Sequence, residues 1–263
     1  MPTNPRINLN ADLGESFGPW VMGEDNALLD VVSSANLACG FHAGDPDVMQ
    51  RTVRACVAKG VSIGAHPGYH DLQGFGRRAL KLSHTEIENL IAYQVGALAG
   101  VAALEGGRVT HVKPHGALNN QACADAGIAA AICRAVRGID PGLILLAPAA
   151  SALLAAGREA GLPVVEEIFA DRAYQDDGQL APRGTPGAMV HGAENCAAHV
   201  QAMLAEKALI ALSGKRIPTA IGSVCVHGDG PGAVVVARHL RQALAAAGWE
   251  IASLPALMPA SGG

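Results

Sequence analysis

From residue 6 onward, the chain repeats one pattern: a short apolar run, a loop rich in Gly and polar residues, and a segment with helical periodicity. This alternation predicts strands joined by helices, and strands that helices cover on both sides pair in parallel. The pattern predicts seven strands, at residues 7–9, 35–38, 61–65, 109–112, 143–147, 164–168 and 224–226, and a weaker eighth near Ile251. We therefore expect an α/β fold built on a parallel sheet.

Capping residues mark the helix boundaries. Asp45 and Pro46 suit the N-cap and first turn of a helix that Gly60 ends. Ser83 and Glu86 form a capping box before a second segment with one apolar face. The same periodicity predicts further helices at residues 125–136, 151–160, 194–209 and 232–247.

Polar residues at the strand ends distinguish a closed barrel from an open sheet. An open sheet places its site at one switch point, whereas a barrel collects residues from many strand ends. Most of the seven predicted strands run into Asp, Glu, His or Lys. Because 263 residues suit one barrel and no linker divides the chain, we predict a single domain over residues 1–263, a seven-stranded, TIM-like (β/α) barrel.

Composition argues against several classes of protein. The formal net charge of −4 and the 3% of aromatic residues argue against a surface for nucleic acid or anionic membranes. The N-terminus lacks the basic and apolar regions of a signal peptide, and we identify no apolar run long enough to span a membrane. Six Cys without a C-x-x-C pair indicate reduced thiols. We expect a cytoplasmic protein that acts on a small molecule.

The first three strand ends carry carboxylates and imidazoles. Asp12 and Glu15 follow the first strand, His42 follows the second, and His66 and His70 follow the third. Pro and Gly between His66 and His70 exclude a helical H-x-x-x-H metal motif. His66 comes directly off its strand and is the stronger candidate. The alternative for the two carboxylates is a helix cap or a solvated turn.

The fourth and sixth strand ends add a cation and further charges. Lys113 and His115 are separated by one proline, and in such an extended segment side chains two apart point the same way, here into the barrel mouth. Glu167, Asp171 and Arg172 follow the sixth strand, with a surface ion pair as the alternative. These residues extend the candidate site around the barrel.

His227 and Asp229 lie at the tip of the seventh strand, and Arg78 lies in a G-F-G-R-R loop suited to a carboxylate or phosphate. Paired Arg on a loop more often meets only solvent. Of the ten His, five fall within a few residues of a strand's C-terminal end. Clustered carboxylates, imidazoles and an ammonium supply general acids, general bases and oxyanion stabilisation, so hydrolysis or proton transfer at a carbonyl group fits best.

Nucleotide-binding loops are missing from the sequence. The run SGKR at 213–216 lacks the spacing and the hydroxyl of a P-loop, and GDGPG at 228–232 differs from the dinucleotide motif G-x-G-x-x-G. A G-x-S-x-G nucleophile elbow is absent as well. We therefore predict no dinucleotide binding, and no P-loop to hold ATP.

Six long runs resemble the LamB/YcsF family, and together they cover nearly the whole chain in order. They are NADLGESFG at 10–18, SANLACGFHAGDP at 34–46, GAHPGYHDLQGFGRR at 64–78, HVKPHGAL at 111–118, FADRAY at 169–174 and VCVHGD at 224–229. One departure is Asn119, where the family usually has Tyr after HGAL. This difference bears on substrate contacts and leaves Lys113 and His115 in place.

The resemblance implies a barrel of the kind shared with glycoside hydrolases and polysaccharide deacetylases. It also implies an ATP-dependent 5-oxoprolinase, which opens 5-oxo-L-proline to L-glutamate while ATP becomes ADP and phosphate, with two other subunits as partners. A five-membered lactam is a poor electrophile, and phosphate on its carbonyl oxygen makes attack by water feasible. Because the sequence lacks a nucleotide loop, we expect the partners to handle ATP as co-substrate and this chain to handle the lactam or activated lactam.

The resemblance and the chemistry of the side chains together suggest a role for each candidate residue. The predicted catalytic residues are Asp12, Glu15, His42, His66, Lys113 and His115, and the predicted substrate-binding residues are His70, Arg78, Glu167, Asp171, Arg172, His227 and Asp229. Lys113 is expected to stabilise negative charge on the substrate, while Asp12 positions or deprotonates the attacking water. The alternative for Lys113 is a purely structural pair with Glu15 or Glu167.

Two rival functions are kept open. One is a metal-dependent amidase or carbohydrate deacetylase, with Asp12, His42 and His66 as the candidate metal ligands. Metal analysis of purified protein distinguishes this rival. The other is a non-catalytic binding subunit, whose complex would keep its turnover after the cluster is removed.

Overall fold

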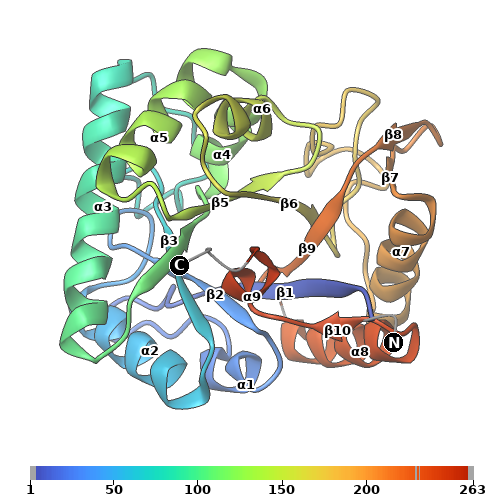
Figure 1. The fold of residues 1–263 in the computed structure, drawn as a ribbon, viewed down its shortest axis with the longest axis horizontal. Helices are drawn as coiled ribbons and strands as arrows, with labels where there is room; N and C mark the ends of the chain where they lie inside the picture. The colour runs from blue at the N-terminus through green and yellow to red at the C-terminus, as the bar shows by residue number, and fades with distance from the viewer. Residues whose placement is uncertain (1–3, 229, 231, 260–263) are drawn as a thin grey trace.

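The computed structural model describes residues 4–228, 230 and 232–259, and its centre is a closed barrel of seven parallel strands (Figure 1). In barrel order these are β1 (Arg6–Leu13), β2 (Ser34–Ala38), β3 (Ser62–His66), β4 (Val109–Val112), β5 (Ile144–Pro148), β6 (Val164–Phe169) and β9 (Ile221–Val226). Pairing of β9 with β1, with Asn8 opposite Ser223, closes the ring. The predicted seven-stranded (β/α) barrel is confirmed.

Helices cover the outside of the barrel (Figure 1). The predicted helices correspond to α2 (Pro46–Lys59), α3 (His84–Leu104), α5 (Ala126–Ile139), α6 (Ala152–Glu159), α7 (Ala193–Glu206) and α8 (Ala233–Ala246). Asp45 accepts hydrogen bonds from two backbone amides at the start of α2, and Ser83 and Glu86 form the expected capping box. The short helices α1 (Asp25–Leu29) and α4 (Gly116–Ala124) follow strand ends and were not predicted.

The predicted helix at 194–209 was wrong at its C-terminal end. Lys207 takes a left-handed conformation with φ of 51°, which ends α7. The next residues form β7 (Ala208–Ile210), which pairs antiparallel with β8 (Arg216–Pro218). The SGKR run therefore lies in a hairpin connection outside the barrel, because its neighbours pair with each other and not with the central sheet.

The C-terminal segment covers the end of the barrel where the strands begin. The weaker eighth strand is present as the short β10 (Glu250–Ile251), which pairs with the start of β1, and α9 (Leu254–Leu257) follows it (Figure 1). Leu254 packs on Ile144, Leu146 and Val165. Its amide donates to Ser34 Oγ at 3.1 Å. This end of the barrel is thus closed by apolar packing and backbone hydrogen bonds.

The interior of the barrel is a column of hydrogen-bonded polar side chains. Asn8, Asn10 and Asp12 alternate along β1 and are buried. Asn10 Nδ2 donates to Glu167 Oε1 at 2.8 Å, and Asn36 Nδ2 donates to Asn10 Oδ1 at 2.7 Å. Because successive side chains of a strand face opposite sides, every second residue of β1 joins this column while the others pack outward. The column leads to Asp12 at the open end.

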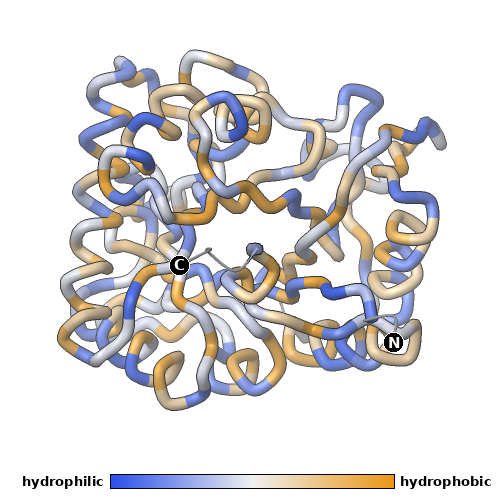
Figure 2. Tube along the Cα trace, in the orientation of Figure 1, coloured by the Kyte–Doolittle hydropathy of each residue, from blue (hydrophilic) through white to orange (hydrophobic). Residues whose placement is uncertain are grey.

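The apolar core lies between the strands and the helices, and Figure 2 shows the strands as largely hydrophobic segments inside helices of mixed character. Contrary to the expectation from sequence, α3 is long and apolar enough, by length and composition, to cross a membrane. In the structure its buried residues Ile87, Ile91 and Leu98 belong to the core, and the helix packs on α5 and β3. Its apolar residues are therefore part of the barrel's outer layer.

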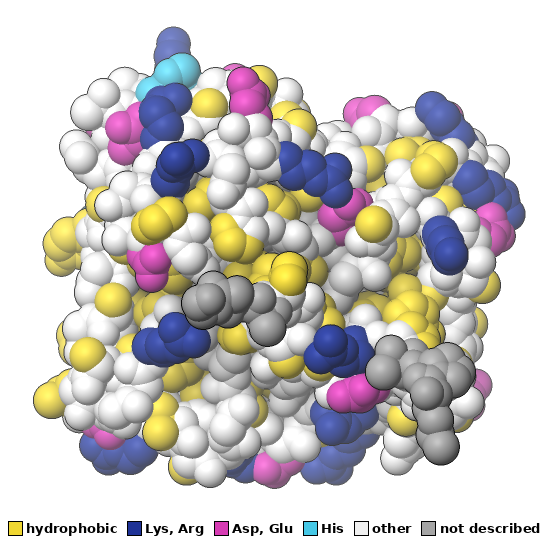
Figure 3. Space-filling model, in the orientation of Figure 1, with side chains coloured by type: hydrophobic (Ala, Val, Ile, Leu, Met, Phe, Trp, Pro, Cys, Tyr) yellow, Lys and Arg dark blue, Asp and Glu magenta, His cyan; other side chains and the backbone are white. Residues whose placement is uncertain are grey.

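The surface carries both signs of charge. On the face that α9 covers, Figure 3 shows Lys and Arg side chains scattered among Asp and Glu.

Candidate active site

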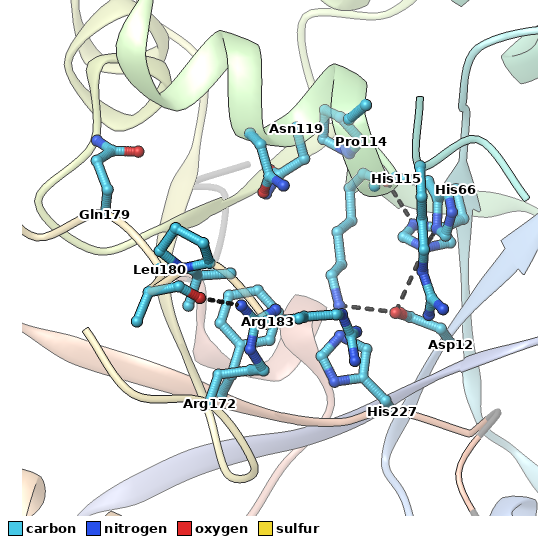
Figure 4. Close-up of a pocket in the computed structure, with 18 residues that line it drawn as sticks. Asp12, His66, Pro114, His115, Asn119, Arg172, Gln179, Leu180, Arg183 and His227 are labelled. Atoms are coloured by element: carbon cyan, nitrogen blue, oxygen red, sulfur yellow. Dashed lines mark hydrogen bonds and ion pairs between the residues drawn. The ribbon is translucent and has the colours of Figure 1, made fainter. Parts of the chain in front are cut away.

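A pocket opens at the ends of the strands opposite α9, with a cavity volume of about 390 Å³ (Figure 4). The ends of β1, β3, β4, β6 and β9 contribute to it, together with α4 and the loop after β6. Its lining includes Asp12, His66, Arg77, Lys113, His115, Asn119, Phe169, Arg172, Arg183 and His227. Both signs of charge and three imidazoles therefore face one small space.

Lys113 lies buried at the floor of the pocket. Its Nζ donates to Asp12 Oδ1 at 2.9 Å and lies 3.4 Å from Glu167 Oε2. It also contacts Cys225 Sγ at 2.9 Å. Burial by itself would lower the pKa of Lys113, but Asp12, Cys225 and Glu167 outweigh it and hold the pKa well above its usual range. Lys113 is therefore a cation at neutral pH. Of the two structural pairs kept as alternatives, the one with Glu167 is present, and Asp12 is a second partner.

The pKa values of the two carboxylates beside Lys113 are shifted in opposite directions. Burial would raise the pKa of Asp12, but His66 and Lys113 hold it well below the usual range. Burial raises the pKa of Glu167 despite Lys113, and the charge of Asp12 adds to this rise. Two carboxylates sharing one ammonium cannot both be fully compensated, so Asp12 is the ionised partner of Lys113.

Asp12 is oriented by the polar column beneath it. Asn36 Nδ2 donates to Asp12 Oδ1 at 2.8 Å, and His111 Nε2 lies 3.0 Å from Asn36 Oδ1. Burial lowers the pKa of His111 to about 3, so its ring is neutral and donates through Nε2 to the amide oxygen. Asp12 Oδ1 therefore accepts hydrogen bonds from both Asn36 and Lys113. The other oxygen, Oδ2, faces His66 Nε2 at 3.4 Å.

Three imidazoles and a carboxylate gather beside Asp12. The rings of His42 and His115 stack at 3.7 Å, and His66 stands edge-on to both. Glu15 Oε1 lies 3.4 Å from His42 Nε2 and 3.9 Å from His115 Nδ1. Burial, followed by the neighbouring imidazoles, lowers the pKa of His42 and of His115 well below the usual range. Both rings are neutral at neutral pH.

Glycines allow the loop after β3 to close on these rings. Gly76 has φ of +61°, and a Cβ there would lie 2.7 Å from His42 Cβ and 2.9 Å from His115 Cδ2. At Gly68 a Cβ would lie 2.7 Å from His42 Nδ1. A side chain at either position would displace an imidazole, so the G-F-G and H-P-G runs fit the packing of the cluster.

The far wall of the pocket carries Arg172 and His227, and Asp171 lies behind His227. His227 Nδ1 lies 2.9 Å from the Asp171 carboxylate, and its ring stacks on Phe169. Arg172 is buried, and its Nη2 donates to Ala181 O at 2.7 Å. Its Nε has no hydrogen-bond partner within the part of the chain that is described.

Among the predicted site residues, Glu15, His42, Glu167 and Asp171 contact residues of the pocket without lining it. Three others lie farther away or outside the described residues. His70 is exposed, and its ring lies on Phe41. Arg78 is paired with Asp71, and its neighbour Arg77 is the one that lines the pocket. Asp229 lies outside the described residues.

Sequence reasoning missed the polar column and part of the pocket wall. Asn36, Ser62 and Ser223 were not predicted, yet each hydrogen-bonds inside the barrel. A period-two pattern gives the signal: N-x-N-x-D at 8–12, S-x-N at 34–36 and H-x-K-x-H at 111–115 place polar residues on one face of each strand. Arg183 and Asn120 come from loop and helix positions without such a pattern.

The Asp171–His227 pair gives a prediction about pH. Burial would lower the pKa of His227, but Asp171 outweighs it and raises the pKa above the usual value of 6.5. In Asp171→Asn the effect of burial is opposed only by the more distant Asp12, so the pKa of His227 should fall. NMR titration of the His227 ring, identified with His227→Gln, measures the change.

The same pair determines how the stability of the wild type, relative to Asp171→Asn, changes with pH. The raised His227 pKa contributes stability below the unfolded-state pKa, and this is lost as pH rises through the folded-state pKa. The lowered Asp171 pKa contributes stability above about pH 4, which is lost in more acidic solution. The wild type should therefore exceed Asp171→Asn most clearly near about pH 5.5 in urea unfolding. An equal or larger gap in alkaline solution would contradict the assignment.

Comparisons with known proteins match this fold and these residues over nearly the full chain. The profile of the LamB/YcsF family matches residues 7–259. A protein from Azoarcus sp. (strain BH72), named as the A subunit of 5-oxoprolinase, is 62% identical over 250 residues, covering 95% of this chain and 98% of that one. The crystal structure of the lactam utilization protein from Thermus thermophilus has a TM-score of 0.89 and 44% identity, covering 95% of this chain and all of that one.

A more distant structure shares the fold alone. The catalytic domain of a peptidoglycan N-acetylglucosamine deacetylase from Eubacterium rectale ATCC 33656 has a TM-score of 0.54 and 11% identity, covering 98% of this chain and 92% of that one. The barrel is thus of the deacetylase type, as expected from sequence.

Proposed function

Because the chain belongs to the LamB/YcsF family, we propose that it is the A subunit of an ATP-dependent 5-oxoprolinase, which opens the lactam of 5-oxo-L-proline to L-glutamate. One observation carries the proposal: 62% identity to a protein named as the A subunit of 5-oxoprolinase, over nearly the whole length of both chains. The deacetylase rival has only a shared barrel in its favour, at 11% identity.

The pocket has the polarity that this substrate requires. 5-Oxo-L-proline carries a carboxylate, a lactam carbonyl and a ring N–H, and it is small enough for a cavity of about 390 Å³. Arg172 is suited to the carboxylate, because its buried Nε has no partner among the described residues while the rest of the guanidinium is anchored on Ala181 O. A buried donor without an acceptor is costly, and a ligand carboxylate removes that cost.

Lys113 and Asp12 are suited to the reacting end of the lactam. The Lys113 ammonium stabilises negative charge on the carbonyl oxygen or on a phosphate attached to it. Asp12 Oδ1 is held by Lys113 and Asn36, so Oδ2 is left to orient a water on the side of His66 and His115. The same Asp12 carboxylate accepts the proton of that water as it attacks.

The chemistry balances in two steps. ATP transfers phosphate to the carbonyl oxygen, water attacks the carbonyl carbon, the C–N bond breaks, and the ring nitrogen takes a proton and becomes the amino group. A second water then hydrolyses the acyl phosphate, giving L-glutamate and phosphate. This chain acts on the lactam, and the ATP-binding site of the complex is assigned to partner subunits, because SGKR lies in the β7–β8 hairpin and not at a strand-to-helix phosphate loop.

We assign the complex to the cytoplasm. All six cysteines lie within the described residues and are free, which fits a reducing compartment.

Arg172 gives a prediction about substrate affinity. In the assembled complex, Arg172→Lys should raise the KM for 5-oxo-L-proline by roughly tenfold to a hundredfold with little change in kcat, because a charged hydrogen bond contributes about 1.5–3 kcal/mol in ground and transition states alike. Steady-state kinetics measure the split. Arg78→Lys is the matched control, since Arg78 is paired with Asp71 outside the pocket. A fall in kcat at unchanged KM would refute this role.

Reconstitution tests the proposal as a whole. We expect the purified chain alone to show neither lactam opening nor ATP hydrolysis, and the complete complex to convert 5-oxo-L-proline to L-glutamate with one ADP formed per lactam. The proposal fails if the partners open the lactam at full rate without this chain, or if the chain alone hydrolyses ATP rapidly. Deacetylation of an N-acetyl sugar by the chain alone would favour the rival function.

A further inference from the structure

Two imidazoles of the site direct lone pairs at each other. His66 Nδ1 lies 2.7 Å from the backbone carbonyl oxygen of Lys113, and His115 Nε2 lies 2.8 Å from that of Phe75. A carbonyl oxygen can only accept, so each of these nitrogens carries the hydrogen. The other ring nitrogens, His66 Nε2 and His115 Nδ1, are therefore unprotonated in the neutral rings. They lie 3.0 Å apart.

Further acceptors face the same point. Glu15 Oε1 lies 3.9 Å from His115 Nδ1 and 3.4 Å from His42 Nε2. His42 is 1% exposed, and neither of its ring nitrogens has a hydrogen-bond partner within the described residues. Buried polar groups left in this state are rare and costly, and a cluster of lone pairs around one point needs a positive charge at its centre.

We propose that Glu15, His42, His66 and His115 form a binding site for a divalent transition metal ion. Their ligand atoms all lie within 4.8 Å of one another, and all four residues are buried. Three imidazoles and one carboxylate are the donor types that Zn²⁺ and its first-row neighbours prefer, whereas Mg²⁺ and Ca²⁺ prefer oxygen ligands. The carbonyl oxygens of Lys113 and Phe75 orient two of the rings from behind, as in many zinc sites.

This assignment differs from the ligand set expected from sequence. The sequence groups Asp12 with His42 and His66, but in the structure Asp12 Oδ1 is occupied by Lys113 and Asn36. The second possible ligand group, Asp12 with Cys225 and His227, already contains a cation, because Lys113 Nζ lies 2.9 Å from both Asp12 Oδ1 and Cys225 Sγ. The metal site is therefore placed on the Glu15 side of Asp12.

The purified full chain, stripped with a chelator, is titrated with Zn²⁺ in calorimetry and with Co²⁺ followed by visible absorption. We expect one ion per chain and a Co²⁺ spectrum with nitrogen ligation. Glu15→Gln and His42→Ala should each weaken binding by roughly a hundredfold or more, since even partners behind the ligands contribute tenfold to a hundredfold. His70→Ala is the matched control, because His70 is an exposed imidazole at the same end of the barrel.

Each outcome decides for or against the site. The proposal is supported if the wild type and His70→Ala bind one ion per chain and Glu15→Gln does not. Because Gln is nearly equal in size to Glu, this result holds even if His42→Ala folds poorly. Absence of stoichiometric binding by the wild type overturns the proposal. Binding of equal strength in wild type and Glu15→Gln overturns it as well. None of these readouts depends on 5-oxoprolinase activity.

Discussion

Replacing Lys113 with Met should lower the turnover of the assembled complex by roughly a hundredfold or more, because the charge that develops on the lactam oxygen then loses its buried cation. The same change should destabilise the chain. Lys113 compensates Asp12 and Glu167, both buried, and removing one partner of a buried ion pair costs about 3–5 kcal/mol. Sequence alone suggests nearly normal folding, since it does not show that this lysine is buried between two carboxylates.

The pH dependence separates this explanation from a general packing defect. Without Lys113, burial raises the pKa of both carboxyl groups, so they become neutral in mildly acidic solution and the cost of the missing cation shrinks. Urea unfolding of Lys113→Met should therefore approach the wild type as pH falls. Lys59→Met is the control, because Lys59 pairs with Asp30 at the surface, where ion pairs contribute about 0–1 kcal/mol. A pH-independent deficit in Lys113→Met would contradict the electrostatic account.

The sequence was sufficient to predict the barrel because each strand and most helices carry local signals. Asp45 with Pro46, and Ser83 with Glu86, mark helix starts through hydrogen bonds that involve only neighbouring residues. The end of α7 could not be predicted this way. Ala208–Ile210 is as compatible with a helix as with a strand, and its pairing with Arg216–Pro218 across the hairpin decides the outcome.

The barrel itself brings several of the predicted site residues together. Asp12, His66, Lys113 and His115 follow different strands, and closure of the ring places them around one pocket. Their individual states could not be predicted. The tautomer of His66 depends on the carbonyl of Lys113, a contact between neighbouring strand ends that only the register of β3 and β4 determines.

Arg78 illustrates a different limit of sequence reasoning. Arg77 and Arg78 are adjacent and chemically identical, and the sequence offers no basis for choosing between them. The loop conformation decides: Asp71 binds Arg78, while Arg77 lies over the Phe75 ring and lines the pocket. The pairing uses a carboxylate seven residues earlier, across a turn that contains Phe75 at φ of 53°.

Replacing Asp12 with Asn should separate catalysis from stability in a way that Lys113→Met does not. Asn keeps the shape of the side chain, and its amide oxygen can still accept from Lys113 and Asn36. Removal of the Asp12 charge also removes one of the causes that raise the pKa of Glu167, so Glu167 ionises more readily and becomes the counter-ion of Lys113. One cation and one anion stay together, and we expect a loss of only about 1–2 kcal/mol in urea unfolding.

Turnover of the complex with Asp12→Asn should nevertheless fall by roughly a hundredfold or more, because the amide can neither supply the negative charge that orients the water nor accept its proton. Asp45→Asn is the matched control: Asp45 caps α2 through its side-chain oxygen, and Asn is an equally good N-cap. Single-turnover measurements on the complex, paired with unfolding curves of the free chain, give both quantities. A folded Asp12→Asn chain whose complex retains near-wild-type turnover would remove Asp12 from the reaction and assign the charge requirement to Lys113 alone.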